Sequence, residues 1–161
     1  MSNFKTVFFI LGALQIILGL SMIVPILAQF FYNQIDAGFI SSSLVTILFG
    51  ILFVLSNLDY DKKLSLPQAF LLTALSWLSI AIFGSLPFIF SEVDLSFTDA
   101  FFESMSGITT TGSTIITNLN ETPKAILLWR GMLQWLGGIG IIVMAITLMP
   151  LMNIGGMQLF V

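Results

Sequence analysis

The sequence predicts an all-α integral membrane protein, and its composition and segment lengths are the observations behind that class. Hydrophobic residues make up 57% of the 161 residues and charged residues only 8%, whereas a soluble domain carries about 25% charged residues. Four apolar segments each reach the roughly 20 residues that a membrane-spanning helix needs. A net charge of −3 gives no electrostatic basis for binding nucleic acid, and the absence of cysteine and histidine removes thiolate and imidazole chemistry.

The first two predicted helices cover residues 5–31 and 38–58. The first is apolar except for Gln15 and Gln29. It exceeds the ~7–15 residues of a signal-peptide core, so we expect it to stay as a membrane helix. Pro25 removes one helical hydrogen bond and predicts a kink. The second segment carries no charge and is again long enough to span.

The third predicted helix covers residues 65–90. Ser65 is a candidate N-cap, and Pro67 falls in the first turn, where a missing N–H costs little. The segment is uncharged to its end, with Pro87 close to that end. We expect it to cross the membrane.

Residues 97–107 predict a short helix that cannot cross. Eleven residues rise only about 16 Å, which is about half of the ~30 Å hydrocarbon core. Such a helix enters halfway and turns back, which is allowed only where protein or a watery cavity surrounds it. With the loop TTTGST at 109–114, this layout is how a membrane protein presents backbone carbonyls to a dehydrated ion.

The fourth predicted helix covers residues 124–150. It is apolar but contains Arg130, Gln134 and the glycine cluster GGIG at 137–140. No strand precedes the cluster, so it is not a nucleotide-binding fingerprint. Small residues that let helices approach closely are its ordinary explanation.

The loop at 109–114 has the composition that carbonyl coordination of a cation requires. Backbone carbonyls can replace the water of a potassium ion without a counter-charge that would hold the ion too tightly. Gly112 tolerates unusual dihedral angles. Four threonines can pack and hydrogen-bond behind the strand: Thr109, Thr110, Thr111 and Thr114. The alternative is a Ser/Thr-rich surface loop, because such residues also favour turns.

Acidic residues gather around the short helix. Those near its start and beyond the loop are Glu92, Asp94, Asp99 and Glu121. They could concentrate cations at a pore mouth, or they could form a solvated loop in which Asp99 lies in the first turn of the helix. Glu103 is deeper, where a charge is expensive and usually paired, and we expect it to pair with Arg130 behind the loop.

Basic residues set the expected orientation. Lys5 and the pair Lys62 and Lys63 favour the cytoplasm. The N-terminus is then cytoplasmic, and the short helix enters the membrane from outside. Lys124 and Arg130 fall on the outer side and are exceptions to the simple rule.

Three stretches carry a family signature. They are LSFTDAFFESMSGITTTGSTI at 95–115, LWRGMLQWLGGIGIIVMAITLMP at 128–150 and GGMQLF at 155–160. Together they resemble the Trk-type potassium uptake proteins of the Trk/Ktr/HKT superfamily. The two helices ahead of the first pore unit, at 5–31 and 38–58, fit the TrkH branch.

The resemblance implies four helix–pore-helix–helix repeats in one chain around one pore. By this resemblance, the filter residues that bind K⁺ through their carbonyls are Thr110, Thr111, Gly112 and Ser113, and Thr109 and Thr114 flank them. The K⁺ site itself is expected at Thr110 and Thr111. Glu103 and Arg130 are expected to give structural support. Family members form homodimers, work with a cytoplasmic nucleotide-binding regulatory subunit of the TrkA type, and lie in the plasma (inner) membrane. The resemblance implies no enzymatic activity, and potassium is cargo rather than a cofactor.

On this interpretation, residues 1–63 are two scaffold transmembrane helices with a cytoplasmic loop, and residues 64–161 are the first M1-P-M2 repeat. We therefore expect the chain to be the N-terminal portion of a longer potassium transporter. Two alternatives remain open: a self-assembling tetrameric cation-channel subunit, and a non-conducting membrane scaffold in which TTTGST is only a turn. The sequence does not decide between a channel and an ion-coupled symporter.

Overall fold

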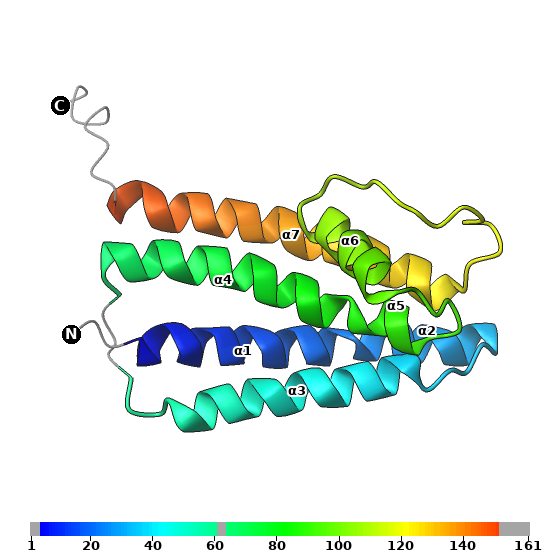
Figure 1. Ribbon diagram of the computed structural model, residues 1–161, viewed down its shortest axis with the longest axis horizontal. Helices are drawn as coiled ribbons and strands as arrows, with labels where there is room; N and C mark the ends of the chain where they lie inside the picture. The colour runs from blue at the N-terminus through cyan, green and yellow to red at the C-terminus, as the bar shows by residue number, and fades with distance from the viewer. Residues whose placement is uncertain (1–3, 61–63, 152–161) are drawn as a thin grey trace.

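The computed structural model describes residues 4–60 and 64–151, and all of the regular structure in those ranges is helical. The helices are α1 (Lys5–Ser21), α2 (Ile23–Tyr32), α3 (Gly38–Ser56), α4 (Leu66–Gly84), α5 (Leu86–Phe90), α6 (Phe97–Ile108) and α7 (Lys124–Leu151). Figure 1 shows the long helices running side by side, with the short α6 beside one end of the bundle. The all-α class is confirmed.

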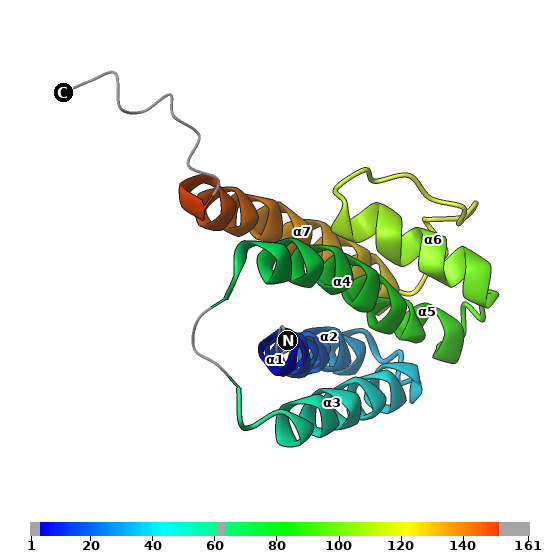
Figure 2. The same ribbon diagram turned by 60° about the vertical axis from the view of Figure 1, so that its left-hand side comes forward.

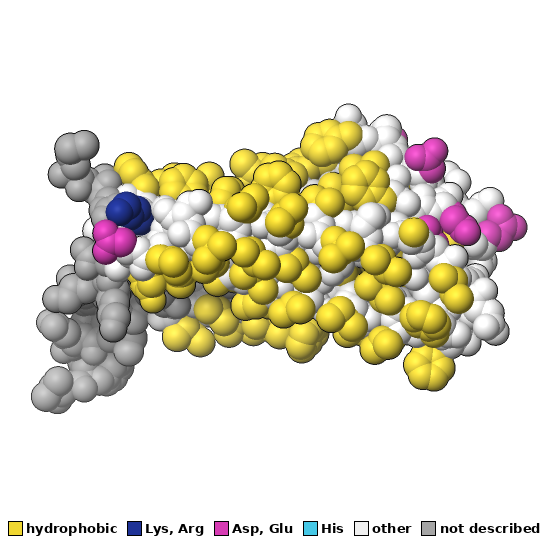
Figure 3. Space-filling model, turned by 90° about the horizontal axis from the view of Figure 1, so that it is seen from below, with side chains coloured by type: hydrophobic (Ala, Val, Ile, Leu, Met, Phe, Trp, Pro, Cys, Tyr) yellow, Lys and Arg dark blue, Asp and Glu magenta, His cyan; other side chains and the backbone are white. Residues whose placement is uncertain are grey.

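Within these ranges, four helical segments are long and apolar enough to cross a membrane. They are Lys5–Tyr32, Gly38–Ser56, Leu66–Phe90 and Lys124–Ile146. Figure 3 shows hydrophobic side chains along the length of the bundle and charged ones at its two ends. That distribution is the one a bilayer requires, and the four predicted spans are present.

Two of the four spans are broken by proline. Because Pro25 has no N–H to donate to the Ser21 carbonyl, the first span divides at Met22 into α1 and α2, where the sequence predicts a kink. Ser85 divides the third span in the same way, two residues before Pro87. The sequence predicts that span as one helix, so this second break is a difference from the expectation.

The start of α4 is fixed by the residues that the sequence singles out. The side-chain Oε1 of Gln68 accepts a hydrogen bond from the Ser65 backbone N–H at 2.9 Å, as in a capping box. Pro67 lies in the first turn. The predicted N-cap and first turn are confirmed.

Small residues bring α1 and α3 into contact. A Cβ added at Gly12 would lie 2.7 Å from the Gly50 carbonyl oxygen, and one added at Gly50 would lie 2.8 Å from the Gly12 carbonyl oxygen. Farther along, the Ser43 hydroxyl donates to the Gly19 carbonyl at 2.8 Å. This is glycine-mediated helix packing of the kind that membrane proteins use.

The buried residues of the main core come from α1, the α1–α2 junction, α3, α5, α6 and α7, and Figure 2 shows α5, α6 and α7 close together at one end of the bundle. Trp129 of α7 is fully buried at the centre of this core, and its ring packs edge-on against Phe39 with 6.2 Å between centroids. The Trp129 indole N–H donates to the Gly84 carbonyl at 2.9 Å. Because α4 ends at Gly84, this bond satisfies a carbonyl that has no partner within its own helix. The core thereby fixes α6 and α7 against the end of α4.

Candidate functional site

The short helix α6 lies at the end of the bundle away from the start of α1 and the end of α7 (Figure 1). It has 12 residues, one more than the sequence predicts, and so rises about 18 Å. Ser96 caps its start: the Ser96 hydroxyl accepts from the Asp99 N–H at 3.2 Å and donates to the Asp99 carboxylate at 2.7 Å. Asp99 therefore supports the helix start, which is the structural alternative considered for that residue.

The chain leaves α6 through a tight backbone turn. The Ser106 carbonyl accepts hydrogen bonds from the Thr111 N–H at 3.0 Å and the Gly112 N–H at 3.2 Å. Gly112 has a φ of +78° and Thr110 a φ of +60°, so left-handed residues alternate with Thr111. In such an alternation successive N–H groups point to one side and can share one acceptor, which here is the Ser106 carbonyl. The unusual backbone geometry that the sequence predicts at Gly112 is present. Thr110 also has a positive φ, which its residue type does not predict.

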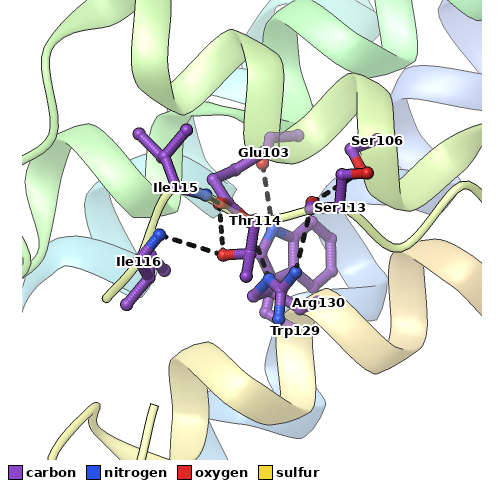
Figure 4. A network of polar contacts seen from close by, with 9 residues as sticks. Glu103, Ser106, Ser113, Thr114, Ile115, Ile116, Trp129 and Arg130 are labelled. Carbon is purple, nitrogen blue, oxygen red and sulfur yellow. Dashed lines mark hydrogen bonds and ion pairs between the residues drawn. The ribbon is translucent and has the colours of Figure 1, made fainter. Parts of the chain in front are cut away.

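A buried carboxylate holds the far side of the loop. Oε1 of Glu103 accepts from the Thr114 hydroxyl at 2.5 Å and from the Ile115 N–H at 2.6 Å. Oε2 accepts from Nε of Arg130 at 2.7 Å. The Glu103 side chain is 0% exposed and that of Arg130 13%. Figure 4 shows these side chains converging from α6, the loop and α7, and the pairing expected from the sequence is present.

Ser113 differs from the loop residues before it, because its carbonyl is bonded within the protein. It accepts from the Ser106 hydroxyl at 2.7 Å and lies 3.5 Å from an outer nitrogen, Nη2, of Arg130. This carbonyl is therefore directed toward α6 and α7 (Figure 4). Ser106 thus bonds to the loop with both its carbonyl and its hydroxyl, a role that its residue type alone did not reveal.

The carbonyls of Thr110, Thr111 and Gly112 are left free. All three residues are exposed, and in the described ranges no hydrogen bond ends on their carbonyl oxygens. The hydroxyls of Thr109 and Thr111 are 2.9 Å apart, and that of Thr109 also donates to the Met105 carbonyl at 2.8 Å. Uncharged oxygens held open in this way can replace the water of a monovalent cation.

Side-chain metal ligation is a different chemistry, and the described residues offer no group of three His, Cys, Asp or Glu that could hold a metal ion. Beyond Asp99, the acidic residues considered at sequence level are Glu92, Asp94 and Glu121, all exposed. Among the described contacts, none of these three bonds to the loop 109–114. The carbonyls of the loop are thus the oxygens that the site offers to a cation.

Helix α7 runs behind the loop and touches it at several points. A Cβ added at Gly137 would lie 1.8 Å from the Ile108 carbonyl oxygen, so α7 meets the end of α6 backbone to backbone. A Cβ added at Gly107 would lie 3.0 Å from the Leu133 Cβ, and one at Gly112 would lie 3.6 Å from Nε2 of Gln134. The glycine cluster predicts that another helix packs closely against α7, but the structure is needed to show that Gly137 is the residue in contact. A Cβ at Gly138 or Gly140 would meet nothing within 4 Å.

Comparison with known proteins places this arrangement among cation transporters. A protein-family model described as TrkH, cation transport protein, matches residues 36–160. The chain is 42% identical over 161 residues to the Trk system potassium uptake protein TrkH of Escherichia coli, and the match covers 98% of this chain and 33% of that protein. The Trk system potassium uptake protein TrkI of Halomonas elongata is 41% identical over 157 residues, with 94% of this chain and 31% of that protein covered.

A solved structure is similar as well. The crystal structure of the potassium transporter TrkH from Vibrio parahaemolyticus superposes with a TM-score of 0.90 at 38% sequence identity, covering 96% of this chain and 33% of that one. The chain spans about a third of the length of the relatives that it matches.

Proposed function

Because the chain belongs to the TrkH family of cation transport proteins, we propose that residues 109–114 form one filter loop of a pore that moves potassium across a membrane. The observation that carries the proposal is the contrast between the two sides of this loop. Its inner side is bonded to Glu103, Ser106 and Arg130, while the carbonyls of Thr110, Thr111 and Gly112 accept no hydrogen bond from the residues that the structure describes. A filter requires both properties, since the backbone must be rigid and its oxygens available.

The proposed ligands follow from the free carbonyls. Thr110 and Thr111 supply the K⁺-binding carbonyls together with Gly112. The carbonyl of Ser113, the fourth that the family resemblance implies, accepts hydrogen bonds from Ser106 and Arg130, so we propose that it anchors the loop. Thr109 and Thr114 flank the site, and each hydroxyl bonds back to α6. Glu103 and Arg130 act as support rather than as ligands.

One loop supplies only part of a coordination shell. We propose that the rest comes from three further pore repeats of a longer chain, because the relatives are about three times as long as the matched region. In this arrangement, residues 1–63 are scaffold and residues 64–161 are the first repeat. Transport makes and breaks no covalent bond, so the protein is proposed not to be an enzyme, and potassium is its cargo.

The surroundings proposed for the protein rest on the family resemblance. They are the plasma (inner) membrane, a homodimer, and a cytoplasmic nucleotide-binding regulatory subunit of the TrkA type. A cytoplasmic N-terminus fits Lys5, which lies at the end of the bundle opposite α6 and pairs with Asp59 at 3.3 Å. Lys62 and Lys63, which support the same orientation in the sequence, lie outside the described residues.

A chimera tests the proposal. The 161 residues replace the matching third of the Escherichia coli relative, and the chimera is expressed in a strain that lacks potassium uptake. We expect growth on limiting potassium. The Gly112→Asp variant should not grow, because a carboxylate on the filter glycine adds a charge and a side chain at the ion path. Asn120→Asp, which adds the same group on an exposed loop, should grow like the parent.

The outcomes separate the three interpretations. Growth of Gly112→Asp at the parent rate, with equal amounts in the membrane, would show that the loop is only a turn in a scaffold. Growth of cells that express the 161 residues alone would instead favour a self-assembling tetrameric channel. A crosslinking ladder in mild detergent that ends at four subunits would support that alternative.

A further inference from the structure

Gln134 is a polar side chain at membrane depth whose role is not explained by the loop's own hydrogen bonds. It lies ten residues after the start of α7, about 15 Å along the helix axis, which is near the middle of a ~30 Å core. It is partly exposed, and in the described part of the chain it makes no hydrogen bond. A polar group at this depth is costly unless it faces other polar groups, and the filter loop is beside it.

Gln134 belongs to a row of α7 residues that follows the back of the loop. Arg130, Gln134 and Gly137 are spaced four and three residues apart, so they share one face of the helix. Arg130 meets the Ser113 carbonyl, and Gly137 meets the Ile108 carbonyl. Gln134 lies between them, with its Nε2 3.6 Å from the place that a Cβ on Gly112 would take. The row therefore runs from Ser113, after the free carbonyls, to the end of α6, before them.

The end of the side chain that faces the loop is a hydrogen-bond donor. A Cβ built on Gly112 would lie 3.6 Å from Nε2 of Gln134, and an amide nitrogen carries two N–H donors. Ser113 shows what a donor from the protein does here, since its carbonyl is drawn toward Ser106 and Arg130. Gln134 makes no such bond in the described part of the chain, so its two donors stand unused beside the free carbonyls of the loop.

We infer that Gln134 is a specificity-determining residue whose neutral amide acts on the backbone around Gly112. In this way it sets the number of carbonyls that face the ion and how rigidly they are held. This inference rests on the proposed filter function. The number and field strength of carbonyl dipoles are what distinguish potassium from sodium in a flexible filter. Gln134 is a positioning residue in this account, because it acts on the ion through the loop.

Two variants remove the donor in different ways. Gln134→Leu leaves no polar group, whereas Gln134→Glu keeps the shape but replaces the N–H donors with a carboxylate oxygen. The matched control is Gln15→Leu. Gln15 is also an amide inside a membrane helix, but it is fully buried between α1 and α4 and donates to the Ser79 hydroxyl at 2.6 Å, away from the loop.

The experiment measures potassium uptake by the chimera while sodium is added as a competitor. We expect both Gln134 variants to take up potassium but to be inhibited by a sodium concentration about twofold to tenfold lower, an effect no larger than that of one hydrogen bond. Gln15→Leu should lower the amount of folded protein and leave sodium sensitivity at the parent value. If Gln134→Leu does not reach the membrane, the sodium sensitivity of the isosteric variant Gln134→Glu tests the inference.

Parent-like sodium sensitivity in the Gln134 variants, with potassium uptake intact, would overturn the inference and leave the filter proposal standing. Loss of all uptake at normal membrane levels would also overturn it, because a residue that tunes preference leaves transport in place. Failure of the unsubstituted chimera to take up potassium is a separate result and counts against the proposed function itself.

Discussion

The hairpin of α1 and α3 and the α6–loop–α7 region are both embedded in apolar surroundings, but different interactions hold them together. In the hairpin, Gly12 and Gly50 bring two backbones together, and one hydroxyl, that of Ser43, bonds across to a carbonyl. In the loop region, the buried Glu103 pairs with the partly buried Arg130, and both are bonded to backbone groups. The first is close packing with few polar contacts, and the second is a polar network.

The difference follows from what each region must do. Packing by small residues needs no precise polar geometry, since it is driven by van der Waals contact. A filter backbone must stay extended with its carbonyls unbonded, so other groups have to hold its N–H groups and its flanks. The structure therefore predicts that changes in the two regions have separable effects on stability and on ion uptake.

The largest effect is expected at Glu103. Glu103→Gln leaves the Arg130 guanidinium, whose side chain is 13% exposed, without its counter-charge. Breaking a fully buried pair from one side costs roughly 3–5 kcal/mol, which is the upper limit for this partly buried one. Potassium uptake by the chimera should be abolished, and thermal unfolding in detergent should shift downward. Asp59→Asn breaks the solvent-exposed pair with Lys5 and should change neither measurement. Equal effects of the two substitutions would contradict the network described here.

Charge reversal sharpens the same test. Arg130→Glu alone places a second carboxylate beside Glu103 and should abolish uptake. The double variant Glu103→Arg with Arg130→Glu restores the pair, although the bonds to Thr114 and Ile115 need a carboxylate on α6. We expect recovery of the folded amount without recovery of uptake. Recovery of both would show that the pair matters only for folding.

A smaller effect is expected where α7 meets α6. Gly137→Ala places a methyl group against the Ile108 carbonyl, and overpacking of this kind costs about 1–3 kcal/mol. Because the end of α6 must move, potassium uptake should fall together with the unfolding temperature. The matched control is Gly138→Ala, one residue on, which meets nothing within 4 Å and should be neutral. Equal behaviour of the two variants would show that the backbone contact is unimportant.

Trp129 should give an intermediate result. Trp129→Phe keeps an aromatic ring beside Phe39 but loses the bond to the Gly84 carbonyl, and a single hydrogen bond is worth about 1 kcal/mol. The unfolding temperature should fall slightly, while uptake is largely retained. Loss of uptake without loss of stability would instead place Trp129 in the ion path.

The smallest effect is expected in the hairpin. Ser43→Ala removes the bond to the Gly19 carbonyl, and hydrogen bonds between membrane helices average about 0.6 kcal/mol. Uptake and its sodium sensitivity should match the parent. A change in sodium sensitivity would mean that the hairpin influences the filter, against the separation proposed here.

Local residue patterns predicted much of this fold because the relevant interactions are local. Ser65 and Pro67 mark the start of α4, Pro25 marks the break after α1, and the length of α6 follows from its sequence. The Glu103–Arg130 pair could also be predicted, since a charge at that depth needs a partner and the chain offers few. The filter assignment itself stays a proposal.

Other features depend on contacts between distant parts of the chain. Nothing in the residue type of Ser106 shows that it holds the loop. Thr110 adopts a left-handed conformation that its residue type does not favour. Of the glycines in the cluster at 137–140, only Gly137 meets the end of α6. These contacts join residues that are brought together by folding, so periodicity and spacing do not identify them.

The most direct test of the filter proposal is to locate the ion. Crystals of the chimera grown with rubidium in place of potassium would give an anomalous signal from the bound cation. The account predicts a peak on the pore side of the loop, within coordination distance of the carbonyl oxygens of Thr110, Thr111 and Gly112. Rubidium bound in the chimera with no peak at these carbonyls would contradict the proposal that this loop is part of the filter.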